Sequence, residues 1–294
     1  MHRRLPALAS SLLLCTCAHL GGSPRDLAAG WLELRSEHFR LRTNLDPEEG
    51  AELISVLEDD LQALAQAVPS GRVPPGEVNV IAFSSVEQVR EFDPHPAFYV
   101  SNGRGTLIVL GAEATFLPGR ELPVGQEATH ELAHYVTAPG ARGWPRWLAE
   151  GMAQYLETVA LEGRGEGRTA VIGRASPSLV YSMQAGTVPL RKLWEWDTAT
   201  QLAAADEHHL YVTAWAWVHF LTNRHPGQLL DWERRLAAGE EPRPAFAAAF
   251  PGLTDELLDG ELYGYLGGGE YVTSTRPIPE RGLRASVSPL PPAS

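Results

Sequence analysis

The spacing of hydrophobic residues predicts that the chain begins as a small sheet with helices beside it. Residues 31–35 and 38–43 have the apolar anchors of two short strands. Residues 47–68 repeat leucine and valine at helical spacing, which predicts a helix. The apolar and β-branched run 78–83 predicts a buried strand, and residues 84–92 predict a short helix opened by a serine cap.

A hairpin and two helices are predicted in the middle of the chain. Strands at 98–100 and 106–110 flank a glycine-containing turn. Residues 126–136 contain no glycine or proline, so a helix can run through them. A second helix is predicted over Pro145–Tyr155, because proline suits a first helical turn. The Gly- and Arg-rich stretch 163–173 predicts a loop.

Helices are expected to dominate the region that follows. One opens near His208 and continues through Leu221. His219 and His225 are expected in the core or at the surface rather than on a metal. The tryptophans expected to anchor the core are Trp194, Trp196, Trp215 and Trp217.

This order of elements predicts an α+β fold in two parts. A small N-terminal mixed α/β sheet region is expected over residues 30–115, and a mainly helical region over residues 116–266. Three glycines follow, and then a stretch rich in proline and serine with no apolar period. Residues 267–294 are therefore predicted to form a flexible tail.

The first 22 residues have the form of an export signal. Two arginines precede an apolar run from Leu5 to about Leu20, which is too short and interrupted for a membrane span. Both cysteines of the chain, Cys15 and Cys17, lie in this run, and Leu14–Cys17 resembles a bacterial lipobox. The sequence predicts an exported protein, either a cell-envelope lipoprotein anchored through Cys17 or a secreted one, without a disulfide framework.

Composition narrows the choice of partners. The chain has 294 residues, 44% of them hydrophobic, which is enough for one or two cores. Its net charge of −12 argues against nucleic acid and against an anionic membrane surface as partners. Membrane contact is expected only through a lipid at Cys17, and the sequence leaves the oligomeric state open.

The most informative residues are His130-Glu131-Leu132-Ala133-His134, which read H-E-x-x-H. Residues four apart project from one face of a helix, so the two imidazoles can share one metal ion. Glu131 is next to the first ligand, where it can touch a metal-bound water without binding the metal. It is therefore the candidate general base. The alternative for these five residues alone is a solvated helix with two histidines and an acid.

A zinc hydrolase needs a third protein ligand and an open fourth position. Glu150, on the helix predicted after Pro145, is the candidate. The loop 137–144 has glycines and a proline that can turn the chain back, so that Glu150 faces the histidines. Gly151 permits a close helix–helix approach. An ordinary exposed helix acid is the alternative reading of Glu150.

Two segments carry a resemblance to a known family. Thr129–Tyr135 reads T-H-E-L-A-H-Y, and Pro145–Tyr155 reads P-R-W-L-A-E-G-M-A-Q-Y. Together they resemble the peptidase MA-like gluzincins, whose signature is H-E-x-x-H followed by W-L-x-E-G-x-A-x-Y. The resemblance implies a zincin-like fold, peptide or protein substrates, and one Zn²⁺ held by His130, His134 and Glu150. Glu131 would be the base.

The family suggests roles for residues outside the motif. Gluzincins commonly place a Tyr or His donor across the metal, and Tyr211 is the candidate, with a packing tyrosine as the alternative. They also pair an extended substrate with a sheet edge, and Thr106–Leu110 is the candidate edge, with an interior strand as the alternative. Glu127 and Gln154, one helical turn from ligands, could orient an imidazole.

The sequence thus predicts an exported zinc metallopeptidase that cleaves peptide bonds with a metal-activated water. Three other functions remain open at this point. The site could hydrolyse a non-peptide amide in cell-wall material. The chain could be a zinc-stabilised binding module without activity, or a surface lipoprotein with an incidental metal site. An intact Glu131 argues against the inactive module, because a structural site needs no base.

Overall fold

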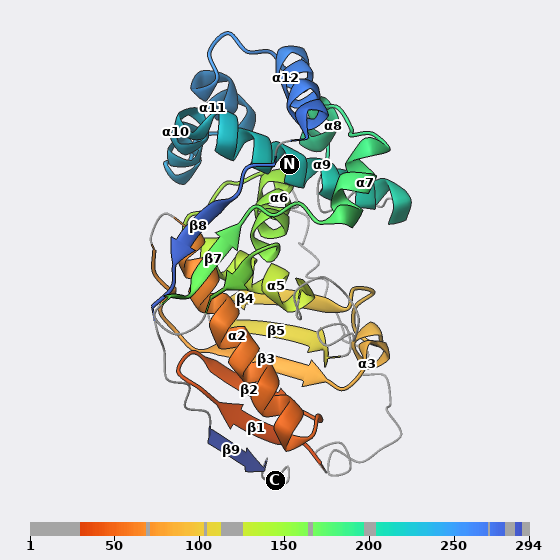
Figure 1. The fold of residues 1–294 in the computed structure, drawn as a ribbon, viewed down its shortest axis with the longest axis vertical. Helices are drawn as coiled ribbons and strands as arrows, with labels where there is room; N and C mark the ends of the chain where they lie inside the picture. The colour runs from red at the N-terminus through yellow and green to blue at the C-terminus, as the bar shows by residue number, and fades with distance from the viewer. Residues whose placement is uncertain are drawn as a thin grey trace, which may run out of the picture.

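The computed structural model describes residues 30–68, 71–102, 105–112, 126–163, 167–196, 204–269, 271–279 and 286–289. A mixed sheet lies at one end of the molecule, and a group of helices lies at the other (Figure 1). The predicted export signal and Cys17 lie outside the described residues.

The larger sheet has six strands in the order β4-β5-β3-β2-β1-β9. Its strands β2, β3 and β5 run parallel, whereas β4 and β1 pair antiparallel with their neighbours. The strands are β1 (Leu32–Arg35), β2 (Phe39–Thr43), β3 (Val78–Phe83), β4 (Ala97–Asn102), β5 (Gly105–Gly111) and β9 (Ser286–Pro289).

Helix α2 (Pro47–Ala67) crosses one face of this sheet (Figure 1). Asp46 caps its first turn by accepting from the backbone N–H of Glu48 and Glu49, which satisfies donors that the helix leaves unpaired. Leu53, Leu57, Leu61 and Leu64 are buried along one side of α2. The helix predicted over 47–68 is confirmed, and the short helix over 84–92 is observed as α3 (Val86–Arg90).

The predicted hairpin is present, and of the two alternatives for residues 106–110 the interior strand is correct. Residues 106–110 belong to β5, which pairs with β3 on one side and β4 on the other. Both rows of backbone hydrogen-bonding groups of β5 are therefore occupied, and the strand is interior. The edge of the sheet is β4, whose ladder in the described residues is formed with β5 alone.

The helical end of the molecule is built around α9 (Ala204–Arg224), which packs along α6 (Arg146–Glu157). A Cβ placed on Gly151 would lie 2.5 Å from the backbone oxygen of Ala214, so only glycine permits this approach. The remaining helices are α5 (Gln126–Thr137), α7 (Pro177–Gln184), α8 (Leu190–Trp194), α10 (Pro226–Ala237), α11 (Pro242–Ala249) and α12 (Asp255–Gly268).

A second sheet, together with strand β9 of the first, shows that two predictions are wrong. Its order is β6 (Ala160–Glu162), β7 (Thr169–Ile172) and β8 (Ser274–Pro277). Strand β7 lies in the stretch expected to be a loop, and β8 and β9 lie in the stretch expected to be a flexible tail. These short strands have no clear apolar alternation, and β8 and β9 are held by backbone pairing with distant partners.

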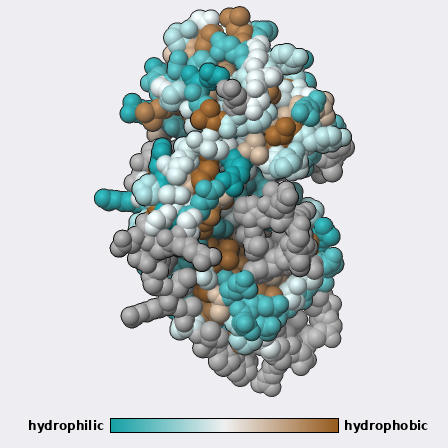
Figure 2. Space-filling view, viewed as in Figure 1, coloured by the Kyte–Doolittle hydropathy of each residue, from teal (hydrophilic) through white to brown (hydrophobic). Residues whose placement is uncertain are grey.

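One hydrophobic core joins the two ends of the molecule. Trp196, Trp215 and Trp217 are buried as expected, and Trp194 packs against Trp147 and Trp232. Figure 2 shows hydrophobic residues interspersed with hydrophilic ones over the coloured surface of one face. Within the described ranges, none of the helices combines the length and hydropathy of a membrane span.

Candidate metal centre

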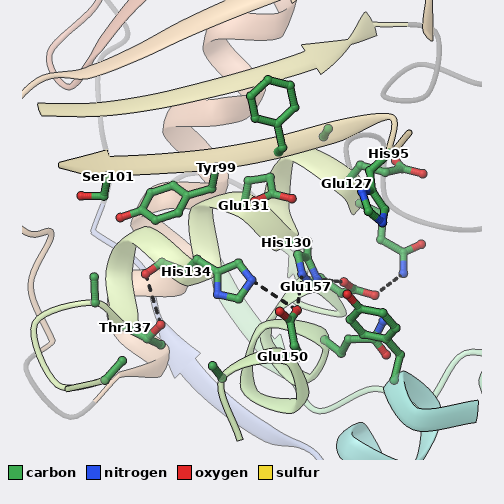
Figure 3. A pocket seen from close by; sticks show the side chains of 18 of the residues that line it. His95, Tyr99, Ser101, Glu127, His130, Glu131, His134, Thr137, Glu150 and Glu157 are labelled. Carbon is green, nitrogen blue, oxygen red and sulfur yellow. Dashed lines mark hydrogen bonds and ion pairs between the residues drawn. The ribbon is translucent and has the colours of Figure 1, made fainter. Parts of the chain in front are cut away.

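Helices α5 and α6 bring the three predicted ligands together. His130 and His134 stand one turn apart on α5, and Glu150 faces them from α6 (Figure 3). The Oε2 atom of Glu150 lies 3.4 Å from Nε2 of His130 and 3.5 Å from Nε2 of His134. One ligand atom from each residue falls within a group no wider than 4.8 Å.

This donor set fits zinc. Two imidazole nitrogens and one carboxylate oxygen are usual ligands of a catalytic zinc site. Ligands about 2.0–2.1 Å from a tetrahedral zinc lie about 3.4 Å from one another, which agrees with the two distances from Glu150 Oε2. The arrangement leaves one side of the group facing a cleft of about 1050 Å³, which we call the metal cleft.

Glu157 orients the first histidine. Nδ1–H of His130 donates to Oε2 of Glu157 at 2.6 Å, and Nε2 of Gln126 donates to Oε1 at 2.7 Å. Because Nδ1 is held by Glu157, Nε2 is the nitrogen of His130 that faces Glu150. Glu127 and Gln154, the residues expected to orient an imidazole, also line the metal cleft.

The charge around the ligands favours a cation. Burial opposes a charge on His130, but Glu150 and Glu157 raise the pKa of His130 well above its usual value. Burial also acts to raise the pKa of Glu150, yet the hydrogen bonds of both histidines hold it well below its usual range. The carboxylates of Glu150 and Glu157 beside His130 would also stabilise a divalent cation.

Glu131 lies beside the ligand group and not within it. Its side chain points from α5 toward β4 (Figure 3). Burial raises the pKa of Glu131, and the two histidines offset this only in part. A carboxylate whose pKa is raised toward neutrality can accept a proton and release it again, as a general base requires.

Arg146 approaches the second carboxylate oxygen of Glu150. Its Nε lies 4.0 Å from Oε1 of Glu150, its Nη2 contacts Glu207 at 3.2 Å, and its guanidinium covers the ring of Trp196. Before the structure, the i, i+4 spacing of Arg146 and Glu150 was the one indication of this role.

Tyr211 reaches the metal cleft from α9. Burial raises the pKa of its hydroxyl to about 12, and Glu150 adds to the shift while Arg146 opposes it. The hydroxyl therefore stays protonated and can donate a hydrogen bond. Its ring also packs edge-on against Trp196 at 4.9 Å. His208, one turn earlier on α9, lines the same cleft.

Strand β4 forms the wall opposite α6. Ala97, Tyr99 and Ser101 line the metal cleft, and Tyr99 stacks near His134 with ring centroids 6.2 Å apart. Figure 3 shows Tyr99 and Ser101 along the strand, above the ligand group. An extended chain could pair with this edge while passing the ligands.

Sequence reasoning missed Glu157, Arg146 and Tyr99. Glu157 follows Glu150 by seven residues, which is two helical turns, so a search for acids on the same face of α6 could have found it. Tyr99 offered no such signal, because its place depends on the packing of β4 over α5.

The described part of the chain is a mixed α/β protein in which His130, His134 and Glu150 could together hold a metal ion. Residues 123–242 match the model of a family described as Protein of unknown function (DUF1570). This segment contains the three ligands, Glu131 and Tyr211, but none of the six strands of the larger sheet. A comparison with curated proteins gives no match.

Proposed function

We propose that this protein is a zinc-dependent metallopeptidase of the gluzincin type with a zincin-like fold. One observation carries the proposal: two imidazoles and a carboxylate converge on one point, with a separate carboxylate, Glu131, beside them. A purely structural site has no need of that additional acid. Strand β4 pairs with β5 alone among the described residues, and this edge together with the size of the metal cleft supports a peptide substrate.

His130, His134 and Glu150 would hold the zinc. Zinc bound by such ligands polarises a carbonyl group and lowers the pKa of a water molecule. Glu157 keeps His130 in the tautomer that offers Nε2, and Arg146 limits the movement of Glu150. These two contacts hold the ligand atoms in place before any substrate arrives.

The chain supplies the proton transfers and the substrate contacts. Glu131 takes a proton from the attacking water and passes it to the amine that leaves. Tyr211 donates its hydroxyl proton in a hydrogen bond to the carbonyl oxygen as that oxygen gains negative charge. The backbone of β4 binds the substrate backbone without regard to its sequence, and Tyr99 covers one side of the site.

The test compares Glu131→Gln with the wild-type full chain. We expect unchanged zinc content by elemental mass spectrometry and a loss of peptide-library cleavage on the order of 10²–10⁴-fold. Glu52→Gln, an exposed acid on α2, is the matched control and should retain full turnover. Full activity in Glu131→Gln would refute the mechanism. Retention of zinc after both histidines are changed to alanine would refute the metal site.

We also propose that the protein is exported. The charged start, the apolar run and the lipobox-like Leu14–Cys17 support this. Mass spectrometry of the native N-terminus should find a chain that begins at Cys17 with a lipid, or a plain secreted one that begins after the apolar run. An intact Met1 in the producing cell would contradict export.

A further inference from the structure

A second cavity adjoins the metal cleft on the far side of Glu157. Its volume is about 690 Å³, and its wall is formed by α2, the end of α6, β6 and residues 174–177. We call it the α2 cavity. Gln126 and Glu157 line both spaces, so one hydrogen-bonded pair stands between them. The proposed peptidase mechanism uses no residue that lines only the α2 cavity.

The α2 cavity combines apolar walls with acidic groups. Most of the charged groups there already have partners. Asp59 pairs with Arg168 at 2.9 Å, and Arg174 pairs with Glu162. Glu157 accepts hydrogen bonds from His130 and Gln126, as described above. The apolar residues on the wall are Val56, Val159, Ala160, Leu161, Ala175 and Pro177.

Asp60 also lines the α2 cavity, but it has no charged partner among the described residues. Its residue is 8% exposed, and Oδ2 accepts a 2.6 Å hydrogen bond from the hydroxyl of Thr129. Among the described residues, Oδ1 has no donor and Asp60 has no cationic partner. Burial raises the pKa of Asp60 to about 7, and the Thr129 hydrogen bond offsets this only in part. A buried carboxylate that faces a cavity without a counter-ion is costly, and either a proton or a bound cation would relieve that cost.

We propose that the α2 cavity binds an ammonium or guanidinium group on an aliphatic chain, with Asp60 as its counter-ion. The apolar wall suits the hydrocarbon stem, and the carboxyl group suits the charged end. A bare metal ion fits less well. In the described part of the chain, only His130, His134 and Glu150 gather three ligand atoms closely enough for one.

Two sources could supply this chemistry. A free small amine or guanidine could enter the α2 cavity, or a basic side chain of a peptide could enter it. The shared wall of Gln126 and Glu157 places the α2 cavity next to the metal cleft. A peptide bound near the zinc ligands could therefore place a basic side chain in the α2 cavity.

The test measures binding of n-butylguanidinium to the zinc-loaded full chain by titration calorimetry. We expect one site and no binding of n-butylurea, which has nearly the same shape without the charge. Asp60→Asn should weaken binding by about tenfold or more, because truncating one partner of a buried charge pair costs more than 1.4 kcal/mol. Ala175→Leu reduces the space without changing charge, so it should also weaken binding and serves if Asp60→Asn does not fold.

Glu131→Gln separates this proposal from the proposed function. It alters the metal cleft only, so n-butylguanidinium should bind to it as to wild type, whether or not the protein is a peptidase. The proposal is overturned if the probe does not bind, if n-butylurea binds equally well, or if Asp60→Asn binds as tightly as wild type.

A second comparison identifies the source of the group. In the Glu131→Gln protein, a capped peptide with one arginine is compared with the same peptide carrying citrulline. Tighter binding of the arginine peptide that Asp60→Asn abolishes would assign the cavity to the substrate. Equal binding of the two peptides, together with the expected binding of n-butylguanidinium, would assign it to a free small cation.

Discussion

Glu157 offers the sharpest test of how the metal centre is held together. Its carboxylate accepts 2.6 and 2.7 Å hydrogen bonds from His130 and Gln126, and its side chain is 10% exposed. Glu157→Gln keeps an acceptor for His130, and the Gln126 amide can turn to accept from the new NH₂ group. This change therefore removes charge while keeping the hydrogen bonds. Glu157→Ala removes both.

The size of the effect follows from the geometry. Partners that orient a metal-binding histidine typically contribute 10–100-fold in metal affinity, which is about 1.4–2.7 kcal/mol. A hydrogen bond to an ionised group is about twice as strong as a neutral one. We therefore expect a loss of about tenfold in zinc affinity for Glu157→Gln and of about 100-fold for Glu157→Ala.

The assay is competition for zinc against a chromophoric chelator, with unfolding curves to show that each variant folds. Gln154→Ala is the control, because Gln154 lies on the same helix and lines the metal cleft, yet has no hydrogen bond to a ligand in the described structure. Its affinity should match wild type. Wild-type affinity in Glu157→Ala would refute the orienting role of Glu157.

Three other predictions follow from particular contacts. Gly151→Ala places a methyl group 2.5 Å from Ala214 O, so urea unfolding should show that the free energy of unfolding falls by about 1–3 kcal/mol. An unchanged urea midpoint would contradict the close packing of α6 on α9. Tyr211→Phe should keep zinc and lower kcat by about 10²–10³-fold, and unchanged kcat would leave Tyr211 only its packing on Trp196. The pKa of Asp60 is about 7 in the folded state, compared with an ordinary value of 3.8 for an aspartate. The folded state therefore binds the proton more tightly than the unfolded state does. The stability of wild type relative to Asp60→Asn should therefore fall as pH rises from about 4 to 7, by at most about 4 kcal/mol. Urea unfolding at pH 5 and pH 8 checks this, and a constant difference would show that Asp60 ionises freely.

The sequence alone determined the local part of the metal centre. The i, i+4 spacing of His130 and His134 places both on one face of any helix that contains them, and no glycine or proline interrupts α5. The helix that carries Glu150 was predictable from Pro145 at its start, even though Gly151 lies within it. Helical periodicity is a local property, so it can be read from a short stretch of residues.

Only the tertiary structure decided which strand borders the site. A hairpin does not reveal which of its strands is interior, and β5 became interior because it pairs with β3, more than twenty residues earlier in the chain. Strands β8 and β9 were missed for a similar reason, since backbone pairing with distant partners holds them.

The surroundings of the ligands also depended on the fold. Glu157 shares a face of α6 with Glu150, but its contact with His130 exists only because α5 and α6 cross where they do. Asp60 meets Thr129 across 69 positions of sequence, and the α2 cavity beside them is a space between elements that are far apart in the chain. Side-chain spacing within one helix is set by local geometry, whereas contacts between helices are set by how the whole core packs.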